Sequence, residues 1–285
     1  MSLPQNIGVL GGGRMGAGIA HAFLLAGARV HVVERDQDAA DAARTRVHES
    51  LERSVARSGD ALSLDDLTSA LTVGTAVDDF AQAGLVIEAV PEDRALKAEA
   101  LSRIEAVVAG DAVLATNTSS ISITDLAGGL SFPERFLGMH FFNPVPSSAL
   151  IEVVIGTQTL TSLVDTLRGW VAELGKTAVI VRDSPGFASS RLGVMLALEA
   201  IRMLEEGVAS AADIDAAMEL GYRHPTGPLR TTDIVGLDVR LGIAEELERA
   251  FGERFAPPAL LRRMVDDGQL GRKSGRGFYD WSDER

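Results

Sequence analysis

A glycine-rich turn between an apolar strand-like segment and an apolar helical segment begins this chain. Residues 6–10 (Asn-Ile-Gly-Val-Leu) are typical of a short buried strand, and Gly11-Gly-Gly-Arg-Met-Gly16 follows directly. Residues 17–26 form an apolar helical segment that ends before Gly27, which can form a left-handed helix cap. This order of strand, glycine turn and helix predicts the first part of a βαβ unit.

The three glycines of the turn have different physical roles in such a unit. Gly11 permits the tight turn, Gly13 lets the backbone approach a pyrophosphate, and Gly16 allows the helix to pack closely on the strand. The N–H groups and the positive dipole end of the helix then point at the phosphates. The motif therefore predicts a dinucleotide site; the alternative is a glycine loop in another kind of α/β protein.

A carboxylate at the end of the next strand-like segment supports the dinucleotide site. Residues 29–33 (Arg-Val-His-Val-Val) lead into Glu34, eighteen residues after Gly16 and close to the separation expected for a ribose-binding acid. A carboxylate there accepts hydrogen bonds from a 2′-hydroxyl and repels a 2′-phosphate, so we predict NAD rather than NADP. The neighbouring Arg35 is the residue that could instead help to hold that phosphate.

Further strand-like segments extend this pattern and define the fold class. They occupy residues 85–90 and 112–116, with a helical stretch from 94 to 108 between them. We predict an α/β fold, with a Rossmann-like doubly wound sheet in residues 1–183 followed by an all-α C-terminal domain in residues 184–285.

The C-terminal domain is expected to consist of helices and to form a dimer. The predicted helices span residues 187–206, 231–251 and 257–266, and Ser210 with Asp213 resembles the start of another. The first of these helices is apolar on most faces, which predicts burial against a second copy of the chain. The alternative is a self-contained helical bundle.

Composition excludes several classes of function. The net charge of −13 and the pI near 4.8 argue against nucleic acid and anionic membranes as partners. No apolar run has the length of a membrane helix and no signal-type core follows the N-terminus, so we predict a cytoplasmic protein. The chain has no cysteine, and its five histidines lack metal-ligand spacing, so we expect neither disulfides nor a metal site.

A row of basic residues is one candidate for ligand binding. In the helix predicted over residues 38–57, Arg46, Ser50, Arg53 and Arg57 recur at spacings that place them on one face. Such a row is usually a solvated helix face. In so acidic a protein it is also the most concentrated basic surface for an anionic ligand tail.

A histidine and a glutamate in apolar sequence are candidates for catalysis. His140 begins the run His-Phe-Phe-Asn-Pro-Val-Pro, and Glu152 follows in the strand-like residues 150–155. Either residue alone could be an ordinary core or surface residue. Together they suggest a neutral imidazole held by a carboxylate, which can act as a general base.

Several ordered motifs along nearly the full length resemble those of one enzyme family. They are Ala115-Thr-Asn-Thr-Ser-Ser120, residues 138–146, Glu152, Ser184-Pro-Gly-Phe187 and residues 270–279. The chain is similar in these motifs to the 3-hydroxyacyl-CoA dehydrogenases, of the short 3-hydroxybutyryl-CoA dehydrogenase type. The resemblance implies reversible NAD-dependent oxidation of the 3-hydroxyl of an acyl-CoA substrate.

The resemblance also implies roles for individual residues. His140 matches the catalytic base, Glu152 its carboxylate partner, and Ser119 the serine near the reacting hydroxyl. The substrate-binding positions correspond to Ser50, Arg57, Ser119 and Ser190. The positions that contact the cofactor correspond to Gly11, Gly12, Gly13, Arg14, Met15, Gly16, Glu34, Glu92, Lys97, Ser119, Asn143 and Lys273.

Departures from the family pattern leave the substrate open. Ser190 stands where many members have Asn, and Ser147, Ser148 and Ala149 replace Val, Met and Lys. The alternative substrates are a 3-hydroxyacyl thioester of acyl carrier protein, a sugar acid or a carnitine-like compound. A dinucleotide-binding protein without catalytic activity is a further alternative, which the retention of His140, Glu152 and Ser119 disfavours.

Overall fold

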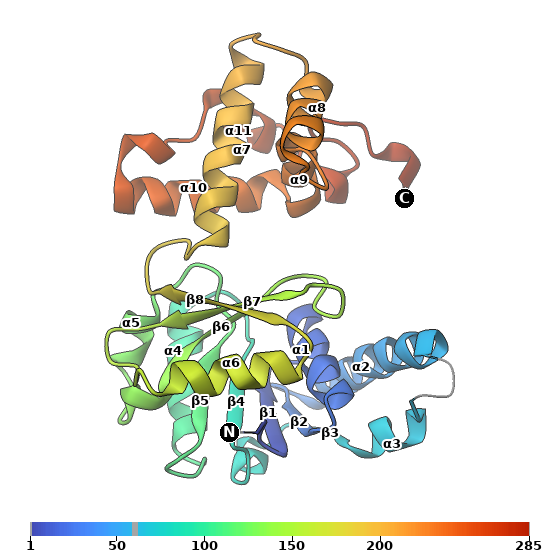
Figure 1. Cartoon of the computed structure of the whole chain (residues 1–285), viewed down its shortest axis with the longest axis vertical. Helices are drawn as coiled ribbons and strands as arrows, with labels where there is room; N and C mark the ends of the chain where they lie inside the picture. Colours follow the sequence, from blue (N-terminus) through green and yellow to red (C-terminus); the bar gives the residue numbers. More distant parts are fainter. Residues whose placement is uncertain (1, 59–61, 285) are drawn as a thin grey trace. The chain divides into compact units, whose positions relative to one another are not determined.

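One eight-stranded sheet forms the centre of the first part of the chain (Figure 1). The computed structural model describes residues 2–58 and 62–284, and the chain divides into two units, residues 1–184 and 185–285. Each unit is described by itself. In the first, the strands lie in the order β3-β2-β1-β4-β5-β6-β7-β8. The strands are β1 (Asn6–Leu10), β2 (Arg29–Val33), β3 (Leu71–Gly74), β4 (Leu85–Glu88), β5 (Val113–Thr116), β6 (Phe136–Phe141), β7 (Leu150–Ile155) and β8 (Thr177–Arg182).

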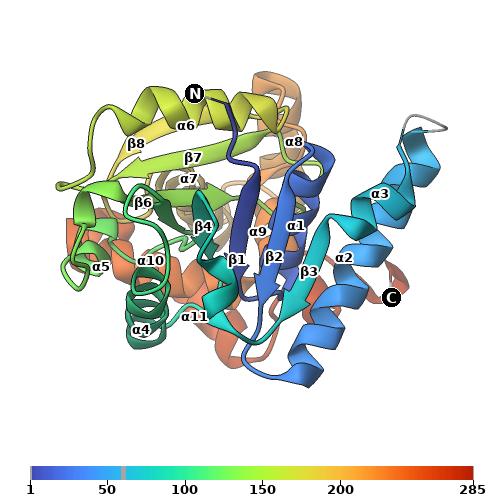
Figure 2. The same ribbon diagram turned by 90° about the horizontal axis from the view of Figure 1, so that it is seen from below.

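Parallel pairing brings the ends of six strands to one edge of this sheet. Strands β3, β2, β1, β4, β5 and β6 are parallel, and the connection reverses its direction along the sheet between β1 and β4. Strand β7 is antiparallel to β6, and β8 is parallel to β7. Figure 2 shows β3, β2, β1 and β4 side by side, with helix α6 running along β8. The predicted doubly wound fold is confirmed, and β7 and β8 add two strands of reversed direction beyond β6.

Six helices accompany the sheet in the described residues of the first unit, and three of them, α1, α2 and α4, correspond to predicted helices. The six are α1 (Arg14–Leu25), α2 (Gln37–Ser58), α3 (Leu64–Ser69), α4 (Arg94–Glu105), α5 (Ile123–Ala127) and α6 (Leu163–Glu173). Helix α1 starts at Arg14 rather than at the predicted residue 17, because Gly13 is its N-cap and the helix includes the end of the glycine turn.

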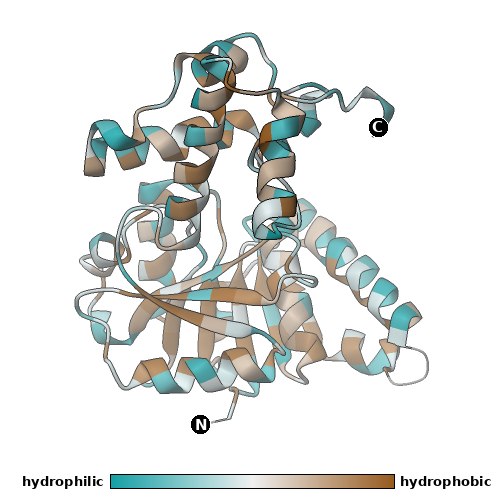
Figure 3. Ribbon diagram, turned by 45° about the horizontal axis from the view of Figure 1, so that its top comes forward, coloured by the Kyte–Doolittle hydropathy of each residue, from teal (hydrophilic) through white to brown (hydrophobic). Residues whose placement is uncertain are grey.

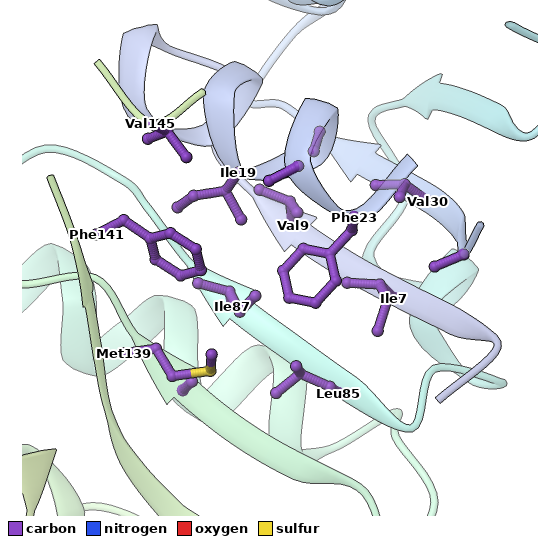
Figure 4. Packing of buried hydrophobic residues seen from close by; sticks show 14 of the residues in the cluster. Ile7, Val9, Ile19, Phe23, Val30, Leu85, Ile87, Met139, Phe141 and Val145 are labelled. Carbon is purple, nitrogen blue, oxygen red and sulfur yellow. The ribbon is translucent and has the colours of Figure 1, made fainter. Parts of the chain in front are cut away.

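Apolar side chains of the sheet and of α1 form the core of this unit. Ile7, Val9, Ile87 and Phe23 are fully buried (Figure 4). The ring of Phe23 meets Phe141 of β6 edge to face, at a centroid distance of 6.4 Å. The sheet strands are accordingly mostly brown in Figure 3, whereas α2 also carries hydrophilic teal segments. This packing fixes α1, and the turn before it, against the sheet.

The second unit consists of helices around a separate apolar core. The helices are α7 (Ser189–Glu205), α8 (Ala211–Tyr222), α9 (Pro228–Val235), α10 (Leu237–Phe251) and α11 (Ala259–Asp266). The predicted all-α character is confirmed, but the single helix predicted over residues 231–251 is wrong. Gly236 has a φ of +108°, which no helix accommodates, so the chain turns there between α9 and α10.

A buried histidine makes the stability of this fold sensitive to acid. His21 of α1 is 1% exposed, and its Nε2 lies 2.8 Å from Ser54 Oγ of α2. Burial, together with the positive charges of Arg57, Arg53 and Lys176, lowers the pKa of His21 to about 4. In the unfolded chain the ring titrates near its ordinary value, so between these pKa values the unfolded state binds more protons.

We therefore expect stability to fall as the pH drops from 7 to 5, by on the order of 1–2 kcal/mol from this residue. The variant His21→Gln cannot be protonated and should lose less stability over that interval. Urea unfolding at both pH values measures the difference, with His48→Gln on the surface of α2 as the control. Equal losses in wild type and His21→Gln would contradict the assignment.

Candidate active site

A cavity of about 800 Å³ lies at the carboxyl ends of the parallel strands of the first unit. This is the edge at which open α/β sheets bind ligands, beside the reversal between β1 and β4. The volume is within the usual range of ligand pockets. The walls include ten of the predicted site residues, namely Gly11, Gly13, Arg14, Met15, Glu34, Glu92, Lys97, Ser119, His140 and Asn143.

The glycine turn has the close contacts that the sequence predicts. Gly11 has a φ of +96° and donates its N–H to the carbonyl of Val33 at 2.8 Å. A Cβ on Gly16 would lie 1.7 Å from the carbonyl oxygen of Gly11, so only glycine permits this approach. Around Gly13, in contrast, a Cβ would meet no atom within 4 Å. Open space before the α1 N-terminus fits the pyrophosphate of a dinucleotide.

Glu34 follows β2 at the rim of the cavity and faces the turn. Its Oε1 accepts a hydrogen bond from the Gly12 amide at 2.7 Å, and its Oε2 accepts one from the Arg35 amide at 3.1 Å. The guanidinium of Arg35 instead pairs with Asp36 at 3.0 Å. The carboxylate thus stands at the wall while Arg35 has its own acidic partner. This arrangement suits a ribose 2′-hydroxyl better than a 2′-phosphate.

His140 and Glu152 form a buried hydrogen-bonded pair. Their backbones lie opposite each other in the antiparallel β6–β7 ladder, and His140 Nδ1 donates to Glu152 Oε2 at 2.8 Å. Glu152 is 1% exposed and His140 is 7% exposed. The ring centroid of Phe142 lies 4.4 Å from that of His140, so apolar surface adjoins the imidazole. His140 belongs to the cavity wall, whereas Glu152 stands behind it.

Glu92 holds the loop that carries Ser119. Its Oε1 accepts hydrogen bonds from the Ser119 amide at 3.0 Å, from the Ser120 amide at 3.3 Å and from Thr118 Oγ1 at 2.5 Å. Lys97 Nζ lies 3.3 Å from the other oxygen. Burial alone would raise the pKa of Glu92, but Lys97 and these donors hold it below its ordinary value. Glu92 is therefore ionised in the cavity wall at neutral pH.

Sequence reasoning missed two polar residues beside this loop. Asn117 lines the cavity, and its Oδ1 accepts a hydrogen bond from the Phe141 amide at 2.9 Å, which ties the end of β5 to β6. Glu88 is fully buried at the end of β4 and pairs with Lys97. A charged residue at the end of an otherwise apolar strand is the signal by which Glu88 could have been found.

Other predicted residues do not line the cavity. Gly12 and Gly16 lie inside the turn, and a Cβ on Gly12 would meet Ala43 at 2.3 Å. Ser50 and Arg57 lie on α2 outside the walls, where Arg57 donates to Ser54 Oγ at 3.4 Å.

Ser190 and Lys273 belong to the second unit. Lys273 Nζ contacts the two carboxylate oxygens of Asp238 at 2.5 and 2.6 Å. In residues 2–58 and 62–284, no group of three or more His, Asp or Glu side chains is arranged to hold a metal ion. No helix in the same residues is long and apolar enough to cross a membrane.

The position of Glu34 predicts a measurable cofactor preference. Replacing Glu34 by Ser removes a charged acceptor, so we expect NADH affinity to fall by about 10- to 100-fold and the preference for NADH over NADPH to shrink. Titration of dinucleotide fluorescence measures both. Glu49→Gln, on the exposed side of α2, is the control and should change neither. An unchanged NADH-to-NADPH ratio in Glu34→Ser would contradict the role of this carboxylate.

Comparisons with known proteins agree with this geometry. Residues 6–184 match the family model of the 3-hydroxyacyl-CoA dehydrogenase NAD binding domain, and residues 186–281 match that of its C-terminal domain. A Mycobacterium tuberculosis protein named 3-hydroxybutyryl-CoA dehydrogenase is 44% identical, over 97% of this chain and 98% of its own. A Bradyrhizobium diazoefficiens protein of the same name is 38% identical, over 97% and 95%.

A solved structure is similar in its fold as well. The crystal structure of (S)-3-hydroxybutyryl-CoA dehydrogenase from Ralstonia eutropha has a TM-score of 0.92 and 39% sequence identity. The match covers 98% of this chain and 99% of that one.

Proposed function

This chain belongs to the 3-hydroxyacyl-CoA dehydrogenase family and is an NAD-dependent dehydrogenase, and we propose that it interconverts short-chain 3-hydroxyacyl-CoA and 3-ketoacyl-CoA. The observation that carries the proposal is that His140, hydrogen-bonded to Glu152 behind it, lies in the wall that also contains the glycine turn and Glu34. A base and a dinucleotide site in one cavity are the two requirements of alcohol oxidation by hydride transfer.

His140 is the proposed general base. Its Nδ1 is engaged by Glu152, so proton exchange with the 3-hydroxyl occurs at Nε2. Glu152 accepts a hydrogen bond from Nδ1–H, which fixes the tautomer and stabilises the imidazolium that forms. Bound NAD would supply the acceptor for the hydride that leaves C3. In the direction of reduction the imidazolium returns its proton to the carbonyl oxygen.

Ser119 is the proposed third contact with the reacting group. It lies in the same wall as His140, and the hydrogen bond from its amide to Glu92 fixes its backbone. Its hydroxyl can donate to the substrate oxygen or accept from it. Ser119 would thereby hold that oxygen within reach of His140.

The test of this function is a steady-state assay with acetoacetyl-CoA and NADH, using His140→Gln as the diagnostic variant. Glutamine keeps a hydrogen-bonding amide but cannot exchange a proton near neutrality. We expect kcat to fall by about 10²- to 10⁴-fold, with NADH affinity nearly unchanged. His48→Gln controls for the loss of a histidine. A fully active His140→Gln enzyme would refute the assignment.

The anionic tail and the acyl group of the substrate are proposed to bind outside the cavity wall. The row of exposed Arg46, Arg53 and Arg57 with half-buried Ser50 on α2 supports an anionic tail, as CoA has. Ser190 is proposed to contact the acyl side. An acyl carrier protein thioester, a sugar acid and a carnitine-like compound are the alternatives. Oxidation of NADH by one of these but not by acetoacetyl-CoA would select it.

The residues that contact the cofactor are proposed to include Lys273 as well as those of the cavity wall.

We also infer a cytoplasmic location, because NAD and CoA thioesters are intracellular metabolites. If the protein turns over a 3-hydroxyacyl thioester, it is not a purely structural dinucleotide-binding protein. Tight NAD binding without any turnover would favour such a structural protein.

The second unit is proposed to form a homodimer. Large apolar side chains are exposed on its helices, with Leu220 84%, Tyr222 75% and Leu192 71% exposed. Large apolar side chains exposed on both α7 and α8 favour a protein interface. We expect a dimer by size-exclusion chromatography with light scattering, and Leu220→Glu should shift it towards monomer. A wild-type monomer at micromolar concentration would overturn the proposal; Leu25→Glu on the first unit is the control.

A further inference from the structure

Glu88 is a buried carboxylate in the middle of the sheet that the mechanism above does not use. It is the last residue of β4 and is 0% exposed. Its neighbours across the sheet are Leu10 of β1 and Thr116 of β5. An ionised carboxylate in such a place is costly unless it is paired and hydrogen-bonded.

Four donor contacts satisfy this carboxylate. Its Oε1 accepts from the Val90 amide at 2.6 Å and from Lys97 Nζ at 2.9 Å. Its Oε2 accepts from Thr116 Oγ1 at 2.6 Å and again from Lys97 at 3.1 Å. The Val90 amide and the Lys97 ammonium can only donate, and the Thr116 hydroxyl, which accepts from the Thr118 amide, can donate to Oε2, so these contacts favour the carboxylate form of Glu88.

Lys97 is shared between two carboxylates. Its side chain is 1% exposed, and besides Glu88 it contacts the Val90 carbonyl at 3.2 Å and Glu92 at 3.3 Å. The three protons of the ammonium group match these three partners. Glu92 in turn holds the amide of Ser119. A continuous polar network thus runs from the centre of the sheet to the cavity wall.

We propose that Glu88 is a positioning residue of the active site. It fixes the Lys97 ammonium and neutralises its charge, so that the negative charge of Glu92 in the cavity wall is not cancelled by Lys97. One lysine with two glutamates leaves the network with a net charge of −1. If Glu88 were neutral, Lys97 would be left to Glu92 alone and the network would be neutral.

That charge has a predictable effect on the cofactor, and this step rests on the proposed function. Hydride transfer places the nicotinamide near His140 and Ser119, beside Glu92. The oxidised nicotinamide ring is positively charged and the reduced ring is neutral, so a negative wall favours the oxidised form. Glu88 therefore contributes to the ratio of NAD⁺ affinity to NADH affinity.

The test compares Glu88→Gln with Thr116→Val in the full-length protein. We expect Glu88→Gln to weaken NAD⁺ binding by about tenfold and NADH binding by about threefold or less. Thr116→Val removes one hydrogen bond to the same carboxylate but no charge. It should lower the melting temperature while leaving the NAD⁺-to-NADH affinity ratio as in wild type.

Kinetics separate positioning from simple destabilisation. For Glu88→Gln, kcat with acetoacetyl-CoA should fall by about tenfold while the KM for acetoacetyl-CoA changes little, because the acyl contacts are elsewhere. An unchanged affinity ratio in Glu88→Gln, or an equal change in Thr116→Val, would overturn the proposal.

A double variant covers the case in which the single variant does not fold. Replacing Glu88 and Lys97 together by Met exchanges a buried ion pair for apolar residues of similar size, a change that proteins commonly tolerate. In this variant Glu92 is the one charged member left in the network, so the net charge stays at −1 and the proposal predicts an NAD⁺-to-NADH affinity ratio close to that of wild type. A ratio that falls as far as the one expected for Glu88→Gln would refute it.

These binding measurements do not depend on turnover. Wild-type protein that binds both dinucleotides but fails to reduce acetoacetyl-CoA would refute the proposed substrate and still allow the test of Glu88.

Discussion

The common edge at which the parallel strands end is the constraint on which the site depends. Parallel hydrogen bonding between β2, β1, β4, β5 and β6 sets their ends side by side. Each strand delivers a polar group there, because the residue just after a buried strand is the first that can turn towards a ligand. Glu34 follows β2, Asn117 follows β5, and His140 lies near the end of β6.

Three carboxylates of this unit can remain ionised in or near its interior because nearby groups donate hydrogen bonds to them. Glu34 accepts from the amides of Gly12 and Arg35, Glu152 from the imidazole of His140, and Glu88 from Lys97 and Thr116. A buried carboxylate without such partners would be protonated or would destabilise the fold. The same bonds that stabilise these charges also set the orientation of the groups in the cavity wall. Stability and preorganisation of the site thus have a common physical origin.

Much of the fold follows from local sequence patterns. Strands β1, β2 and β7 and helix α2 are within about one residue of their predicted limits, because periodicity and glycine position act over a few neighbouring residues. The break at Gly236 was missed, since a glycine inside an apolar helical pattern also occurs in unbroken helices. Strand β8 was not predicted, although residues 178–181 (Ala-Val-Ile-Val) form an apolar run; in the structure this strand is only partly buried.

Local sequence signals predict the chemistry: the glycine turn and the acid after the second strand indicate a dinucleotide site, and a histidine with a glutamate twelve residues later suggests a base. These signals can be recognised in the sequence because each depends on residue type at a short, fixed spacing. Which polar side chains contact one another depends on the tertiary structure. The His140–Glu152 contact requires the β6–β7 register, and the Glu88–Lys97–Glu92 network requires α4 to pack beside the ends of β4 and β5. Such contacts depend on strand pairing between distant segments, whose register is set by burial of the whole sheet rather than by local spacing.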